Sequence, residues 1–209
     1  DRIIMGNVRI LEVKQSIFES NDKQAALLRE ELKKDGVFLL NLMSSPGSGK
    51  TTTLTRTIEA LKDDLKIGVM EADIDSDVDA ETILKTGAKA IQLHTGGMCH
   101  LDADMTRQGL KGLGTDDVEL VILENVGNLV CPAMFDLGES KKVVIVSTTE
   151  GDDKPLKYPH IFQEADICVI NKIDLAPYLN TKVEVLRENA LKVNHHLQIF
   201  EAVSYTHLT

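Results

Sequence analysis

The sequence has 209 residues, which is enough for one α/β domain with a sizeable core. Its formal net charge of −10 argues against non-specific binding to nucleic acid, because a phosphate backbone requires a basic surface. No run of 18 apolar residues would span a membrane, and no charged-then-apolar leader with a cleavage site is evident. Cys99, Cys131 and Cys168 are too few and too scattered for a disulfide framework, so a reducing cytoplasm is expected.

Helices and strands alternate along the predicted chain, which is expected to form a single domain over 1–209. Residues 1–35 are interpreted as an N-terminal helical extension, in which Ser20 caps a helix that ends at Lys34. An almost continuously apolar strand over 37–43 begins the core. Further strands are predicted over 66–70, 88–93, 118–123, 143–147, 167–170 and 197–203, and further helices from Lys50 and over 102–113. This alternation favours a mostly parallel sheet flanked by helices, with ligands at the carboxyl ends of the strands.

A glycine-rich turn follows the strand over 37–43 and leads into a helix. The turn departs from the pattern G-x-x-x-x-G-K-[ST] at Ser44, which takes the place of the first glycine, but the strand–turn–helix setting is intact. Lys50 would reach the β- and γ-phosphates of a nucleotide, and the hydroxyl of Thr51 would hold Mg²⁺. The predicted phosphate-binding residues are Gly47, Ser48, Gly49, Lys50, Thr51 and Thr52.

The strand over 167–170 ends in Asn171-Lys172-Ile173-Asp174, the guanine-specificity signature of GTPases. The carboxylate of Asp174 can accept hydrogen bonds from N1–H and the amino group of guanine together, whereas adenine offers no donor at N1. Asn171 would brace the loop, and the stem of Lys172 would cover the base. The signature lies about 120 residues after the phosphate loop, so it predicts a GTP site.

The strand over 118–123 is followed by Glu124-x-x-Gly127, where most GTPases carry Asp-x-x-Gly. Gly127 is the predicted pivot that senses the γ-phosphate, and Glu124 would support Mg²⁺. Asn128 takes the place of the usual water-orienting Gln, so slow hydrolysis is expected. Asp73 and Asp79 supply further carboxylates near the phosphates, and either could contact Mg²⁺.

A second set of residues has the chemistry of a soft-metal site. Cys99 and His100 are adjacent in a predicted loop, and Cys131 lies seven residues after Glu124. Thiolate and imidazole ligands suit Zn²⁺ or Ni²⁺ and do not suit Mg²⁺. Taken singly, each of these residues could equally be an ordinary core or surface residue, as is expected of Cys168 in its apolar strand. We call residues 124–128 the switch segment, because they are predicted to move when GTP is hydrolysed. If the three residues do bind a metal, movement of the switch segment would reposition Cys131 and so link the nucleotide state to the metal affinity.

Together these motifs resemble the HypB family of nickel-insertion GTPases, which mature nickel–iron hydrogenases. The serine at position 44 is similar to that family's own phosphate loop. The resemblance implies a P-loop NTPase fold of the signal-recognition and dinitrogenase-reductase class. The matching segments are 44–51, 79–81, 99–103, 124–132, 147–154 and 171–174.

The resemblance also implies how the chain would work. It implies a homodimer that forms when GTP binds, with a Ni²⁺ or Zn²⁺ site at the interface built from Cys99, His100 and Cys131 of each chain. It implies a partner nickel chaperone and the hydrogenase large subunit as protein partners. It implies Mg²⁺ contacts at Thr51, Asp73 or Asp79, and Glu124.

Two departures and three rival interpretations accompany this resemblance. The N-terminal Cys-rich or His-rich nickel tracts of some members are missing from this sequence, so delivery is expected in place of storage. Residues 204–209 match nothing expected of the family and are interpreted as truncated or non-native. The rivals are a urease-type nickel-insertion GTPase, a cobalamin-enzyme chaperone GTPase, and a passive Zn²⁺- or Ni²⁺-binding module with little GTPase turnover.

Overall fold

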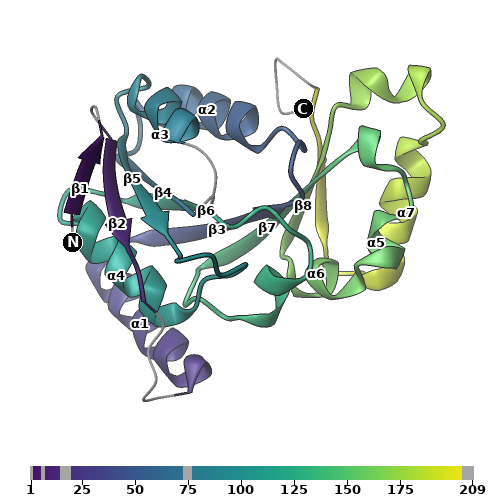
Figure 1. Ribbon diagram of the computed structural model, residues 1–209. Coiled ribbons are helices and arrows are strands. Elements are labelled where there is room, and N and C mark those ends of the chain that lie inside the picture. Colours follow the sequence, from purple (N-terminus) through teal and green to yellow (C-terminus); the bar gives the residue numbers. More distant parts are fainter. Residues whose placement is uncertain (1, 6–7, 15–19, 73–76, 204–209) are drawn as a thin grey trace.

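The computed structural model describes residues 2–5, 8–14, 20–72 and 77–203 of the chain. Its strands form one twisted sheet that lies between two layers of helices (Figure 1). The strands are β1 (Arg2–Met5), β2 (Val8–Glu12), β3 (Phe38–Ser44), β4 (Ile67–Glu71), β5 (Lys89–His94), β6 (Leu120–Glu124), β7 (Lys141–Ser147), β8 (Ile167–Asn171) and β9 (Gln198–Glu201). Among the described residues their order is β1-β2-β5-β4-β6-β3-β7-β8-β9.

All neighbouring strands in this sheet run parallel except β1, which pairs antiparallel with β2. The prediction of an α/β fold with a mostly parallel sheet is therefore confirmed. The helices are α1 (Asn21–Asp35), α2 (Lys50–Leu61), α3 (Asp77–Leu84), α4 (Ala103–Leu113), α5 (Lys154–Lys157), α6 (Pro159–Glu164) and α7 (Val183–Val193). The described ranges also contain the short 3₁₀ helices η1 (Cys131–Met134), η2 (Thr148–Glu150) and η3 (Ile173–Tyr178).

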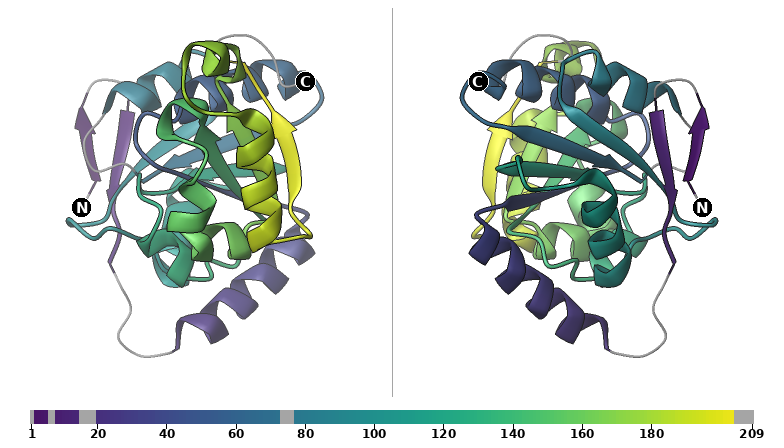
Figure 2. Two further views of the ribbon diagram at one scale, coloured as in Figure 1. Left: turned by 90° about the vertical axis from the view of Figure 1, so that its right-hand side faces the viewer. Right: turned by 90° about the vertical axis from the view of Figure 1, so that its left-hand side faces the viewer.

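The apolar residues of the strands alternate between two faces, and each face has its own helices. On one face Leu28 of α1 and Met105 of α4 pack on the sheet, and α6 and α7 continue this layer over β7 and β8 through Phe162 and Leu186. On the opposite face α2 and α3 cover β3 to β6, with Leu54 buried at the centre. Figure 2 shows α1 on the side of the sheet opposite to α2 and α3. The predicted nucleotide-binding motifs lie at the carboxyl ends of β3, β6 and β8.

The N-terminal part differs from the predicted helical extension over 1–35. Of its described residues, those of α1 are helical, whereas those of β1 and β2 form strands. β2 pairs in parallel with β5, where Ile10 lies opposite Gln92. The Ile- and Val-rich sequence of 2–12 favours strands, and the pairing covers an edge of β5 that would otherwise be exposed.

Two further points concern the limits of the chain. Residues 204–209, interpreted above as truncated or non-native, lie outside the described residues. Within the described residues, no helix combines the length and apolar character needed to cross a membrane.

Candidate functional site

The phosphate loop lies between β3 and α2 with the geometry that its glycines require. Gly47 and Gly49 have φ angles of +75° and +90°, which favour glycine. Helix α2 begins at Lys50, whose side chain is buried. Because the loop leads directly into this helix, the free N–H groups of the helix's first turn face the loop. Thr51 and Thr52 occupy the first turn of α2. The residues predicted to hold phosphate thus form a strand–turn–helix unit.

The Asn-Lys-x-Asp segment supports the phosphate loop from the neighbouring strand β8. The Asn171 amide donates a hydrogen bond to the carbonyl oxygen of Ser48 at 2.9 Å, and Lys172 Nζ donates to the carbonyl oxygen of Gly47 at 2.9 Å. A Cβ atom on Gly49 would clash with the Asn171 amide, so only glycine fits there. Lys172 itself has a φ of +59°, which turns the chain into η3, where the half-buried Asp174 lies. The two motifs are therefore one connected structure.

The predicted switch segment lies directly on the phosphate loop. Glu124, at the end of β6, is 1% exposed, and its Oε1 lies 3.3 Å from Lys50 Nζ. A Cβ atom on Gly127 would lie 3.5 Å from the same Nζ and 3.4 Å from Cγ of Pro46. The backbone of Gly127 is thus in contact with the loop that would hold a γ-phosphate.

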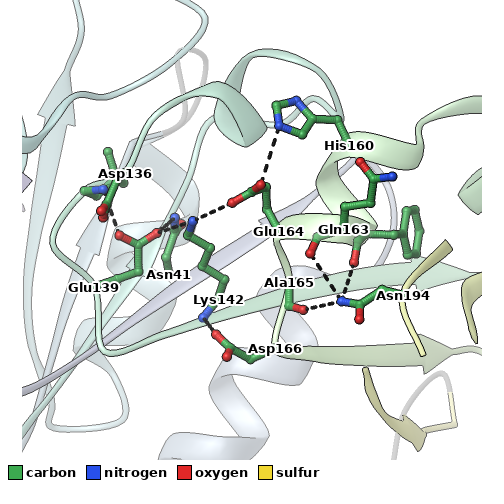
Figure 3. A network of polar contacts seen from close by, with 12 residues as sticks. Asn41, Asp136, Glu139, Lys142, His160, Gln163, Glu164, Ala165, Asp166 and Asn194 are labelled. Atoms are coloured by element: carbon green, nitrogen blue, oxygen red, sulfur yellow. Dashed lines mark hydrogen bonds and ion pairs between the residues drawn. The ribbon is translucent and has the colours of Figure 1, made fainter. Parts of the chain in front are cut away.

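A buried polar chain supports the switch segment from below. The Asn125 amide donates to Asn41 Oδ1 at 3.1 Å, and the Asn41 amide donates to Glu139 Oε1 at 3.1 Å. Figure 3 shows Asn41 and Glu139 beside Lys142, whose Nζ lies 3.9 Å from Glu139 Oε1. Burial raises the pKa of the Glu139 carboxyl, and its hydrogen bond with Asp136 raises it further. Because Asn41, Asn125 and Glu139 are buried and hydrogen-bonded in series, they hold the residue that follows β6 in place.

One contact of the phosphate loop was not predicted from the sequence. The Ser45 hydroxyl donates a hydrogen bond to the Glu150 carboxylate in η2, after β7. Ser147 and Glu150 form a capping box, and Thr148 Oγ1 donates to the carbonyl oxygen of Lys172 at 2.6 Å. The sequence signal for this unit was the Ser-x-x-Glu spacing of Ser147 and Glu150.

The two aspartates predicted near the phosphates are not placed by the structure. Asp73 lies outside the described residues. Asp79 belongs to α3, but only its backbone is described. Their assignment to Mg²⁺ therefore stays a prediction.

The residues predicted to bind a soft metal lie together at the same edge of the sheet. Cys99 follows β5 and Cys131 begins η1 after β6, and their Sγ atoms are 2.6 Å apart. His100 Nδ1 lies 3.8 Å from the Cys99 sulfur, and the imidazole stacks on Phe135 with ring centroids 4.0 Å apart. Asp102 fixes the end of this loop by capping α4, since its carboxylate accepts from the Met105 N–H at 2.8 Å.

The chemistry of these donors fits a thiophilic divalent cation. His100 Nε2 is buried and makes no hydrogen bond inside the described part of the chain, so its lone pair would be available to a metal. Two sulfurs and an imidazole suit Ni²⁺ or Zn²⁺. Even so, no three Cys, His, Asp or Glu side chains of the described ranges are arranged to hold a metal ion by themselves. The assignment of Cys99, His100 and Cys131 to a metal therefore stays a prediction.

The three thiols are expected to react with a thiol reagent in two classes. Cys99 is exposed and Cys131 is half-buried, and the hydrogen bond between the two thiols raises the pKa of Cys131. Cys168 is fully buried, and burial raises its pKa to about 12, so its thiol stays protonated at pH 8. Titration of the reduced native protein with Ellman's reagent should release two equivalents rapidly and the third only in denaturant. Cys168→Ala should leave the two rapidly released equivalents unchanged. Three rapidly released equivalents in the native wild-type protein would contradict the burial of Cys168.

These features define a P-loop nucleotide-binding protein with a Cys/His site next to its switch. The family described as "CobW/HypB/UreG, nucleotide-binding domain" matches residues 38–201, so the chain belongs to this family.

Its relatives place the chain more narrowly within that family. It is 50% identical over 194 residues to "Hydrogenase maturation factor HypB" of Rhizobium leguminosarum bv. viciae, covering 93% of this chain and 65% of the relative. It is 44% identical to the HypB structure from Archaeoglobus fulgidus, with a TM-score of 0.81, covering 87% of this chain and 88% of that one. The chain is therefore a member of the HypB group. It spans 63–65% of the length of the first three of its curated HypB relatives.

Two other solved structures are informative about the site and the fold. HypB from Helicobacter pylori, solved in complex with nickel, is 40% identical with a TM-score of 0.81, covering 89% of this chain and 87% of that one. The signal recognition particle 54 kDa protein from Aeropyrum pernix, in complex with GDP, is 16% identical with a TM-score of 0.62, covering 89% of this chain and 47% of that one. This second likeness bears on the fold alone, and it agrees with the predicted P-loop NTPase fold.

Proposed function

We propose that this chain is a GTP-hydrolysing metallochaperone that inserts nickel during the maturation of nickel–iron hydrogenase. One observation carries the proposal: Gly127 lies against the phosphate loop, and the next residue, Asn128, is hydrogen-bonded to the segments that bear Cys99 and Cys131. A change at the terminal phosphate would therefore reach two metal ligands directly. The names of the HypB relatives and the nickel complex of the Helicobacter pylori protein agree with this function.

In this proposal the N–H groups of 47–52 bind the phosphates, and Lys50 neutralises their charge. Thr51, Glu124 and either Asp73 or Asp79 would hold Mg²⁺, which would supply further positive charge on the β- and γ-phosphates. The side-chain amide of Asn128 is hydrogen-bonded to the backbones of Cys99 and Cys131, so it is not available to orient a water molecule as the usual Gln would. Hydrolysis is therefore slow.

The metal is the cargo of the proposed reaction. Cys99, His100 and Cys131 would hold Ni²⁺, or Zn²⁺ in its place, and a second copy of the chain would complete the ligand set when GTP closes a homodimer. Relaxation of the switch after hydrolysis would then weaken the hold of Cys131 on the metal. A partner nickel chaperone would supply the nickel, and the hydrogenase large subunit would receive it.

The test of this function is GTP turnover by the purified protein, measured with and without nickel. We expect rates in the range of unassisted GTPases, about 10⁻⁴ to 10⁻² s⁻¹. A protein that binds nickel but hydrolyses no GTP under either condition would contradict the proposal and favour a passive metal-binding module.

Replacing Asp174 with Asn is expected to reduce the affinity for GTP by roughly 100-fold or more. The amide would present its NH₂ group to a guanine donor and would leave one guanine hydrogen bond unmade. Competition with GTP and ATP against a fluorescent GDP analogue measures the effect, and the affinity for ATP should not fall in parallel. Asp117→Asn, on an exposed carboxylate that precedes β6, whereas Asp174 follows β8, is the control and should bind GTP normally. An unchanged GTP preference in D174N would contradict the assigned role.

A further inference from the structure

Asn128 makes three hydrogen bonds that join two distant loops. Its amide nitrogen donates to the carbonyl oxygen of Cys99 at 2.9 Å. Its amide oxygen accepts from the N–H of Val130 at 3.1 Å and from the N–H of Cys131 at 2.8 Å. One side chain thus holds the backbones of both cysteines, which are 32 residues apart in the sequence.

This set of partners requires an amide side chain. Cys99 offers a backbone acceptor, whereas Val130 and Cys131 offer backbone donors, so the side chain must donate on one side and accept twice on the other. Among side chains of this length, only Asn satisfies both needs, because Asp cannot donate when ionised. The fixed polarity of the backbone partners also settles which way the amide points.

Asn128 is equally tied to the segment that would sense the phosphate. Its N–H donates to the carbonyl oxygen of Val126 at 2.9 Å, which closes a tight turn around Gly127. Gly127 in turn faces Lys50 Nζ and Pro46 of the phosphate loop. A displacement of Gly127 is therefore passed to Asn128 over one peptide bond.

We propose that Asn128 is the positioning residue that couples the nucleotide to the metal, by moving the Cys99 and Cys131 segments together. This inference rests on the proposed function and specifies the route of its coupling. Thiolates held in one spacing bind the metal, and the nucleotide state sets that spacing through the Asn128 bonds. Loss of the amide should uncouple the two sites without removing either one.

The test compares the nickel affinity of the wild-type protein and of Asn128→Asp in two states, with GDP and with a non-hydrolysable GTP analogue. The wild-type protein should show affinities that differ by about 10-fold or more between the states. In N128D the ratio should fall to within about 2-fold of unity, and the affinity for GTP should stay within about 3-fold of wild type. The nickel–thiolate absorption band gives a second readout: it should change with nucleotide in the wild type and stay constant in the variant. Asn128→Ala, which loses all three bonds, should behave in the same way if N128D folds poorly.

Asn194→Ala is a matched control for the loss of a bridging amide. The Asn194 amide donates to the carbonyl oxygens of Phe162, Gln163 and Ala165 at 3.0, 3.3 and 3.0 Å, and Figure 3 shows it between α6 and the start of β8. This variant should be less stable than the wild type, but the ratio of its nickel affinities in the two nucleotide states should equal that of the wild type. If the wild type binds nickel equally in both states, the proposed function itself fails. If the wild type responds to nucleotide and N128D keeps that response, or weakens nickel equally in both states, the role of Asn128 is overturned.

Discussion

Replacing Cys131 with alanine is expected to weaken nickel binding by about 100-fold or more, while GTP affinity changes less than about 3-fold. The Cys131 sulfur lies 2.6 Å from that of Cys99, so the change removes one of the two thiolates of the proposed ligand set. The phosphate loop should be unaffected, because the backbone of η1 and its bond to Asn128 remain. Isothermal titration with nickel and, separately, with GTP measures both affinities.

Cys168→Ala is the matched control for this variant. Cys168 is fully buried in β8, so its loss leaves a small cavity in the core and no change at the metal ligands. This variant should bind nickel as tightly as the wild type. Equal nickel affinity in C131A and the wild type would exclude Cys131 as a ligand.

Replacing Gly49 with alanine is expected to abolish tight GTP binding, with a loss of at least about 100-fold, and to destabilise the nucleotide-free protein by roughly 3 kcal/mol. A side chain at a φ of +90° costs about 1–2 kcal/mol. The new Cβ would also displace the Asn171 amide from its bond to Ser48, which costs about 1–3 kcal/mol for a buried group. Denaturant unfolding and GTP titration measure the two effects.

Gly47→Ala separates the clash from the backbone strain. Gly47 has a φ of +75°, but a Cβ there would meet nothing within 4 Å. The control should therefore lose only about 1–2 kcal/mol of stability. If both variants lose the same stability, the hydrogen bond from Asn171 to the phosphate loop does not contribute measurably to the free energy of unfolding.

Most of the core could be predicted from the sequence because its strands are apolar runs that end in turn residues. β3, β7 and β8 are examples, and each lies within a few residues of its predicted range. The phosphate loop and the Asn-Lys-x-Asp segment could be located because local spacing defines them. Helix α7 was not predicted, although Val183, Leu186 and Ala190 have a helical spacing that could have indicated it.

What the sequence could not provide were contacts between segments that are far apart in the chain. The strand β2 is stabilised by pairing with β5, which no local pattern shows. The proximity of Cys99 and Cys131 arises because both follow parallel strands that end at the same edge of the sheet. Asn128 is the clearest case. The sequence predicted only that this position lacks the usual Gln, whereas in the structure its side chain is hydrogen-bonded to the backbones of Cys99 and Cys131.

The nickel affinity of the wild-type protein in its two nucleotide states tests the central claim most directly. Because the Gly127–Asn128 segment contacts both the phosphate loop and the cysteine segments, affinities measured with GDP and with a non-hydrolysable GTP analogue should differ by about 10-fold or more. Equal affinities in the two states would contradict the claim that the nucleotide controls the metal site.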